Sequence, residues 1–219
     1  IERFRSGEQF GIEIDRGNRM RMTWRLALGM LLLPITGCAS MQVDRDLKHA
    51  ELSQQYRGAI AQVTAPDATE PCTTPNAGTA WTMFDFTPST PVVRLPSGMN
   101  AAAICVRIPE GARAMEMHSD AKGGMTYFEL IVLHPSQQFL DGNKQLIKDL
   151  PGPKLSPQDT LNGFGLYGVT VLTTDLSNAR YAIVYVHPES LEGAVDVYTG
   201  YHTIPVPYGP YGQVKMRFK

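Results

Sequence analysis

The chain has 219 residues, with 20 Lys and Arg against 21 Asp and Glu, which gives a formal net charge of −1. Because no basic cluster stands out, the sequence lacks the electrostatic footprint of a nucleic-acid-binding protein. Its length is sufficient for one hydrophobic core, so we expect a single folded domain.

The N-terminal part contains a short apolar run, LALGMLLLPI, at residues 26–35. About 20 apolar residues are needed to span a bilayer, so this run is half a span. Basic Arg21 and Arg25 precede it and small residues follow, which is the layout of a secretory signal peptide. Residues 35–38, ITGC, resemble a bacterial lipobox, which implies a diacylglycerol on the Cys38 sulfur, cleavage after residue 37 and acylation of the new amine. A plain signal peptide with an incidental cysteine, or a buried helix, is the alternative.

The boundaries and the destination follow from the same segment. Residues 20–37 are the predicted lipoprotein signal peptide, with translation starting at Met20 or Met22, and residues 1–19 are expected to be upstream sequence read through a misassigned start. A longer basic region is the alternative for residues 1–19. The residue after the cysteine is Ala39, not Asp, which by analogy with lipoprotein sorting in diderm bacteria favours the outer membrane. We therefore expect lipid anchoring to the periplasmic face of that membrane.

Cysteine usage agrees with this compartment. With Cys38 acylated, Cys72 and Cys105 remain, and an even pair in the oxidising periplasm predicts a disulfide. Two separate thiols are the alternative. Removal of residues 1–37 takes away six Arg and four acidic residues and leaves a mature chain of net charge −3.

Residues 38–80 are predicted to be a tether that includes a helix at about 44–62. Residues 64–80 hold three Pro with several Thr and Ala, and they read as a linker. The helix is suggested by a loose apolar stripe at helical spacing, Leu47, Leu52, Tyr56, Ile60 and Val63.

From Trp81 onward, short apolar or alternating segments are bounded by Gly, Pro and Asn, which predicts a single all-β, sandwich-like domain over residues 81–219. Two of the strands end in His-Pro, at residues 134–135 and 187–188, which predicts two strand–turn units of similar design. Residues 137–150 are the exception and are expected to form a short helix or a lid. The expected strands are 82–86, 92–95, 101–108, 112–119, 126–133, 165–176, 179–187, 195–201 and 212–218.

Motifs that would carry chemistry are weak. Residues 163–168 match G-x-G-x-x-G, but the β-branched run 169–174 follows where a dinucleotide site needs a helix, so we expect no cofactor. His118 and Asp120 could contribute to a metal site, although polar residues at the end of a strand are the commoner explanation. No G-x-S-x-G elbow is present. We therefore predict no metal, no catalytic residues and no enzymatic activity.

The densest unusual stretch is VYTGYHTIPVPYGPYG at residues 197–212. Tyr201, Tyr208 and Tyr211 lie there among Gly and Pro, and tyrosines on a stiffened loop offer flat faces with polar tips to sugars or peptides. We predict a ligand-binding face at these three tyrosines. The alternative is a loop that covers one end of the sandwich with its tyrosines half-buried.

The chain from Val92 to Phe218 resembles the maltose operon periplasmic protein family. The resemblance rests on five ordered segments: AAICVRIP, TYFELIVLHPSQQFL, GVTVLTTDL, YAIVYV and TIPVPYGPYGQVKMRF. It implies a periplasmic protein associated with carbohydrate uptake, and it supplies no catalytic residues. We expect an accessory, maltodextrin-type binding protein whose partners are an oligosaccharide or an envelope transport or porin protein. The alternative is a structural or assembly component that docks a protein partner in an envelope complex.

Overall fold

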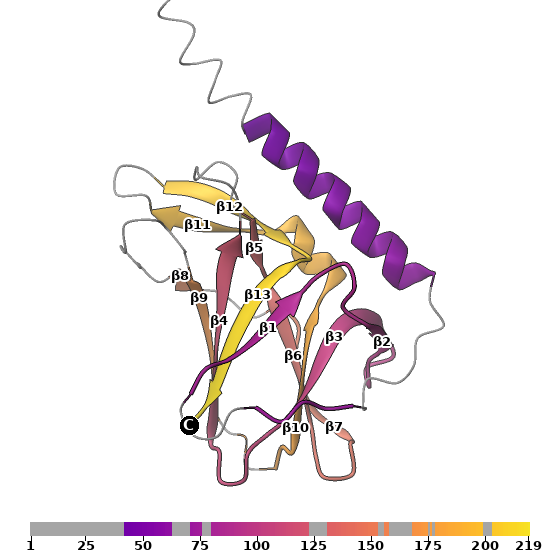
Figure 1. Ribbon diagram of the computed structural model, residues 1–219, viewed down its shortest axis with the longest axis vertical. Coiled ribbons are helices and arrows are strands. Elements are labelled where there is room, and N and C mark those ends of the chain that lie inside the picture. The colour runs from indigo at the N-terminus through magenta and orange to yellow at the C-terminus, as the bar shows by residue number, and fades with distance from the viewer. Residues whose placement is uncertain are drawn as a thin grey trace, which may run out of the picture. The chain divides into compact units, whose positions relative to one another are not determined.

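The computed structural model describes residues 42–62, 71–75, 80–122, 131–152, 156–157, 168–174, 176, 178–198 and 203–219. Within these ranges the fold is an all-β, sandwich-like domain accompanied by a helix at residues 42–61, as predicted (Figure 1). The signal peptide, the lipobox with Cys38, and Tyr201 lie outside the described residues. None of the helices in the described ranges is both long and apolar enough to cross a bilayer.

The larger sheet has eight strands, and all of its pairings except one are antiparallel. The exception joins β5 and β12 in parallel. Two strands lie off the main path, β9 beside β4 and β8 beside β9. In order across the main path, the strands are β1 (Thr82–Phe86), β13 (Gly212–Phe218), β4 (Ala114–Lys122), β5 (Ile131–Leu133), β12 (Thr203–Gly209) and β11 (Ala194–Tyr198), with β9 (Gly168–Thr174) and β8 (Ser156–Pro157) beside them.

The smaller sheet has five antiparallel strands, and a short 3-10 helix, η2 (Pro188–Glu192), follows its β10 strand. Its order is β2 (Val92–Arg94), β3 (Asn100–Arg107), β10 (Tyr181–Val186), β6 (Pro135–Leu140) and β7 (Leu146–Leu150).

The main core is built by alternation along the strands, because successive side chains of a strand point to opposite faces. In β4, Met115 and Met117 are fully buried, while Glu116 between them and His118 after them lie on the opposite face. The neighbouring β13 follows the same pattern, and the five-stranded sheet contributes aliphatic residues of β3 and β10 to the same cluster. The alternation of buried and outward-facing residues expected for strand 112–119 is therefore confirmed.

Residues 137–150 form a β-hairpin, so the prediction of a short helix or lid was wrong. β6 and β7 are joined by a turn in which the Asp141 carboxylate accepts from the backbone N–H groups of Asn143 and Gln145, at 2.8 and 2.9 Å. Such an Asp-centred turn favours chain reversal over a helix. Gln137 and Gln138 are fully buried in β6 although they are polar, so the local polarity did not indicate this strand.

The two His-Pro pairs differ in role, so the prediction of two similar strand–turn units was wrong at the first. His134 alone separates β5 from β6, and the chain passes there from the eight-stranded sheet to the five-stranded sheet without a turn. At the second pair, His187 caps η2 and accepts from the Glu189 backbone N–H at 3.3 Å.

Within the tyrosine- and proline-rich stretch, residues 203–209 form strand β12, and not a loop as predicted. Pro205 and Pro207 are two residues apart, so both lack a donor on the same side of the strand. One residue later, the Tyr208 N–H donates to the Gly193 carbonyl beside β11 at 3.0 Å. The prolines therefore leave that pairing intact.

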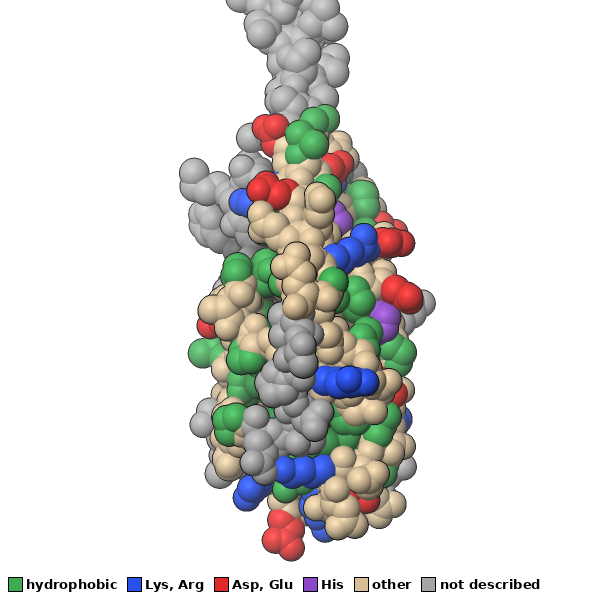
Figure 2. All heavy atoms as spheres, turned by 90° about the vertical axis from the view of Figure 1, so that its right-hand side faces the viewer, with side chains coloured by type: hydrophobic (Ala, Val, Ile, Leu, Met, Phe, Trp, Pro, Cys, Tyr) green, Lys and Arg blue, Asp and Glu red, His purple; other side chains and the backbone are tan. Residues whose placement is uncertain are grey.

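The helix at residues 42–61 packs on the sandwich with a face that is partly polar. Arg45 and Ser53 are buried, whereas Leu47 of the predicted stripe is 65% exposed, so the stripe was wrong at that position. Tyr56 and Ile60 do contact the main core. Figure 2, which looks onto the helix side, shows hydrophobic side chains along both flanks of the helix. The buried face is polar because strand β12 offers carbonyls to it: Arg45 Nη1 donates to Pro205 O at 3.1 Å.

Candidate ligand-binding site

A disulfide between Cys72 and Cys105 braces one end of the five-stranded sheet, and this pairing was predicted. Beside it, the Thr73 N–H donates to Cys105 O at 2.8 Å and the Arg107 N–H donates to Thr73 O at 2.9 Å, so Thr73 forms a parallel bridge with β3. The predicted linker at residues 64–80 is therefore fixed to the sheet around residues 72–73, because a covalent bond and two backbone hydrogen bonds hold it there.

The ladder between β3 and β10 ends at this brace. Arg107 and Tyr181 are directly opposite each other in the register, so their side chains are neighbours on one face. One step further, the Ile108 N–H donates to Arg180 O at 2.9 Å, and the Arg180 N–H donates to Leu140 O of β6 at 2.7 Å. Both arginines thus lie on backbone that three elements hold in place.

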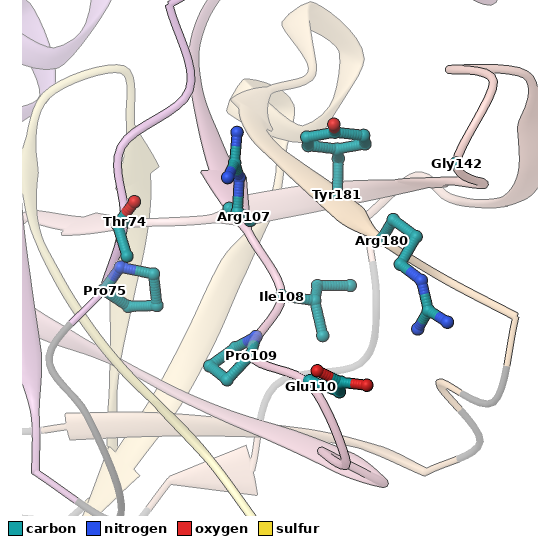
Figure 3. A pocket seen from close by; sticks show the side chains of 9 residues that line it. All are labelled: Thr74, Pro75, Arg107, Ile108, Pro109, Glu110, Gly142, Arg180 and Tyr181. Carbon is teal, nitrogen blue, oxygen red and sulfur yellow. The ribbon is translucent and has the colours of Figure 1, made fainter.

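A cavity of about 610 Å³ lies at this end of the sandwich. Such a volume falls within the roughly 300–1,000 Å³ typical of small-molecule sites. Figure 3 shows Arg107 and Tyr181 together on one side, Arg180 and Glu110 on another, and Ile108 and Pro109 between them. The lining residues are Thr74, Pro75, Arg107, Ile108, Pro109, Glu110, Gly142, Arg180 and Tyr181.

The charges of this cavity are open to a ligand. Arg107, Arg180 and Glu110 are exposed, and within the described part of the chain no ion pair joins either guanidinium to a carboxylate. By contrast, Arg217 pairs with Glu116 at 2.7 Å. The cavity therefore carries two cations, one anion and an aromatic ring on a pre-formed apolar floor.

Tyr208 lies away from this cavity and is half-buried. Its ring stacks on His134 with centroids 4.3 Å apart, and His49 Nε2 of the helix lies 2.6 Å from its carbonyl oxygen. A Cβ added at Gly193 would lie 2.8 Å from two of its ring carbons, so glycine there makes room for the ring. Burial raises the pKa of Tyr208, and the nearby Asp196 raises it further.

Tyr211 is also half-buried, and its ring meets the edge of Tyr56 at a centroid distance of 6.4 Å. Both Tyr208 and Tyr211 pack against the main core. Their surroundings match the interpretation of tyrosines that cover part of the sandwich, and ligand binding by them stays a prediction.

Glu116 is the centre of a second polar group. Its carboxylate is paired with Arg217, with Lys219 at 2.5 Å and with His118 at 3.2 Å. Burial by itself raises the pKa of Glu116, but the hydrogen bonds from Lys219, Arg217 and His118 outweigh that effect and lower it to about 2. His118, weighed above as a metal ligand, is thus bonded to Glu116, and the described residues contain no group of three potential metal-ligating side chains of the His, Cys, Asp and Glu types.

Sequence reasoning missed the residues that line the cavity. Arg107 ends one strand, and Arg180 and Tyr181 begin another, 73 positions later in the chain. An arginine at each of two strand ends is a usable signal only when the pairing of those strands is known. The pairing of β3 with β10 is a long-range contact that no local sequence pattern predicts.

Comparisons with known proteins give no family for this chain. No family model matches it, and no curated protein matches it. Among solved structures, the chain is similar to the enzymatically active domain of tailspike protein 4 from bacteriophage CBA120, with 13% identity and a TM-score of 0.24. The match covers 66% of this chain and 18% of the tailspike chain, and so weak a likeness carries no argument about fold or function.

Proposed function

We propose that this protein is a non-catalytic lipoprotein of the outer membrane that faces the periplasm and acts as an accessory binding protein in carbohydrate uptake. The observation that carries the binding role is the cavity of about 610 Å³ with free hydrogen-bonding groups and an aromatic ring. The lipobox sequence supports the anchor, and the disulfide fits an oxidising compartment. The carbohydrate rests on the family resemblance, which makes maltodextrins the first ligands to test.

Calorimetry with maltose to maltoheptaose tests the binding role. We expect heat with at least one oligosaccharide, and its loss in Tyr181→Ala, because Tyr181 lines the cavity. Tyr211→Ala is the matched control, since Tyr211 lies outside the cavity lining and belongs to the predicted tyrosine face. Loss of binding in Tyr211→Ala alone would place the site at the tyrosine face. The absence of binding heat with every saccharide tried would refute the proposed function.

The anchor is tested separately. Cells that express the chain are expected to incorporate labelled palmitate into it and to hold it in the outer-membrane fraction. Cys38→Ala is expected to abolish both, because the thioether needs the cysteine sulfur. Equal labelling of the Cys38→Ala variant would refute the lipobox assignment.

A second candidate function is supported by the outer face of the helix. Val43 and Leu47 are 57% and 65% exposed and lie one helical turn apart, which is the spacing of an apolar contact pair. Such a pair suits docking of a protein partner in an envelope complex. A photo-crosslinker at Leu47 that captures one protein stoichiometrically would favour this assembly role over ligand uptake.

A further inference from the structure

We propose that the cavity selects an acidic saccharide, with the carboxylate bound at Arg107 and the sugar ring lying against Tyr181. This inference rests on the proposed function in that it takes the ligand to be a carbohydrate, and it differs from it in requiring a negative charge.

The charge of the cavity is uneven. Glu110, the one acid among its described lining residues, lies on the Arg180 side (Figure 3). Arg107 lies apart from it, beside Tyr181, with no carboxylate on its side of the lining. A planar guanidinium binds a carboxylate through two parallel N–H···O bonds, so Arg107 is the natural partner for a ligand acid. The Arg180–Glu110 side offers donors and acceptors that suit hydroxyls.

The floor of the cavity and Tyr181 suit a ring. Ile108 and Pro109 lie between the two polar sides and supply apolar contact. Tyr181 is half-buried and directly opposite Arg107 in the ladder, so a ligand bound by the guanidinium is also within reach of the phenol ring. A uronic acid carries a carboxylate on a sugar ring, so it offers one group to the guanidinium and the other to the phenol ring.

The framework of the cavity is already ordered. The disulfide and the bridge at Thr73 hold the Thr74–Pro75 wall, and Gly142 of the β6–β7 turn lies close to the stem of Arg180. A site built on strand ends with fixed backbone loses little conformational freedom on binding, which favours affinity.

Calorimetry on the full, disulfide-bonded chain with digalacturonate and trigalacturonate, against neutral galactobiose and maltotriose, tests the inference. We expect the uronates to bind more tightly than the neutral sugars, and binding to weaken as salt is raised. Arg107→Gln is expected to lower uronate affinity by about tenfold or more, because a charge-assisted hydrogen bond is lost. Arg180→Gln is expected to have a smaller effect.

Arg94→Gln is the matched control, because Arg94 is also exposed and does not line the cavity, and the substitution removes the same charge. An equal loss in Arg94→Gln would overturn the inference, since it would show a general charge effect. Neutral sugars that bind as tightly as uronates, with no change in Arg107→Gln, would overturn the inference and leave the proposed function standing. Benzoate, an acid without a sugar ring, is a further probe. If benzoate binds through Arg107 and no saccharide binds, the proposed function is refuted, and so is a saccharide as the ligand of the cavity. If none of these probes binds, both the proposed function and the acidic-saccharide inference are refuted.

Discussion

Substitution of Tyr56 by Phe tests how the helix is joined to the sandwich. Tyr56 is 1% exposed, its hydroxyl donates to Val186 O at 2.7 Å, and it accepts from the Ala102 N–H at 3.2 Å. Val186 and Ala102 are the next pair after Tyr185 and Ala103, where the register between β10 and β3 stops. The hydroxyl therefore takes the place of one ladder bond between two strands.

The expected cost follows from this geometry. Tyr56→Phe keeps the ring in the core and removes two buried hydrogen bonds, each of which contributes about 0.5–1.5 kcal/mol to the free energy of unfolding. We expect a loss of about 2 kcal/mol, which at a urea m-value of about 2 kcal/mol/M lowers the midpoint by about 1 M.

Urea denaturation of the disulfide-bonded protein, followed by circular dichroism, measures this loss. Tyr211→Phe is the control, because Tyr211 packs beside Tyr56 and no hydrogen bond of its hydroxyl is found in the described residues. It should change stability by less than about 0.5 kcal/mol. Hydrogen exchange at the Ala102 amide should also speed up in Tyr56→Phe. Stability of Tyr56→Phe within 0.5 kcal/mol of wild type would refute the bridging role.

Three further changes test other parts of the fold. Replacement of Cys72 and Cys105 by Ala should lower the free energy of unfolding by about 3–4 kcal/mol in the chain-entropy model, for a sequence separation of 33, and reductant should match that loss in wild type. The lowered pKa of Glu116, about 2 against an ordinary 4.5, gives a stabilisation of about 3 kcal/mol that is present above pH 4.5 and is lost as the pH falls toward 2. Glu116→Gln should therefore flatten the acid side of the stability profile measured by urea titration, and an unchanged acid slope would contradict this. Gly193→Ala should lower the melting temperature through about 1–3 kcal/mol of overpacking against the Tyr208 ring, and an unchanged melting temperature would show that the ring can move.

Strands with clean alternation were predictable because their burial depends on the local pattern alone. Residues 112–119 and 212–218 show this, since both place methionines inward and charged groups outward as their spacing indicates. Strand β6 was not predictable from local pattern, because the buried Gln138 bonds to other segments: its Nε2 donates to Asp149 Oδ2 of β7 at 3.0 Å and to Ser97 Oγ at 2.8 Å. The burial of a polar side chain is understood only once the strand pairing shows which hydrogen-bond partner lies beside it.

The helix shows the same limit. Its spacing predicted that it exists, but the buried face depends on which carbonyls the sandwich leaves open. Arg45 faces Pro205 O, and His49 faces Tyr208 O. Polar residues therefore lie on the buried face of the helix, where an apolar stripe would predict hydrophobic residues. The cavity depends in the same way on the β3–β10 register, which places Arg107 opposite Tyr181.

The attachment of the helix also decides how far the domain can move under the proposed lipid anchor. A free tether over residues 38–80 would allow a reach on the order of 150 Å when extended. Arg45 near the start of the helix and Ile60 near its end are both hydrogen-bonded to the sandwich, the latter by Asn100 Nδ2 at 3.2 Å. If Cys38 carries the proposed anchor, only four peptide steps separate it from residue 42, and four steps reach at most about 14 Å. Under that proposal the domain would stay in the layer next to the membrane, and a ligand would have to reach that layer to be bound.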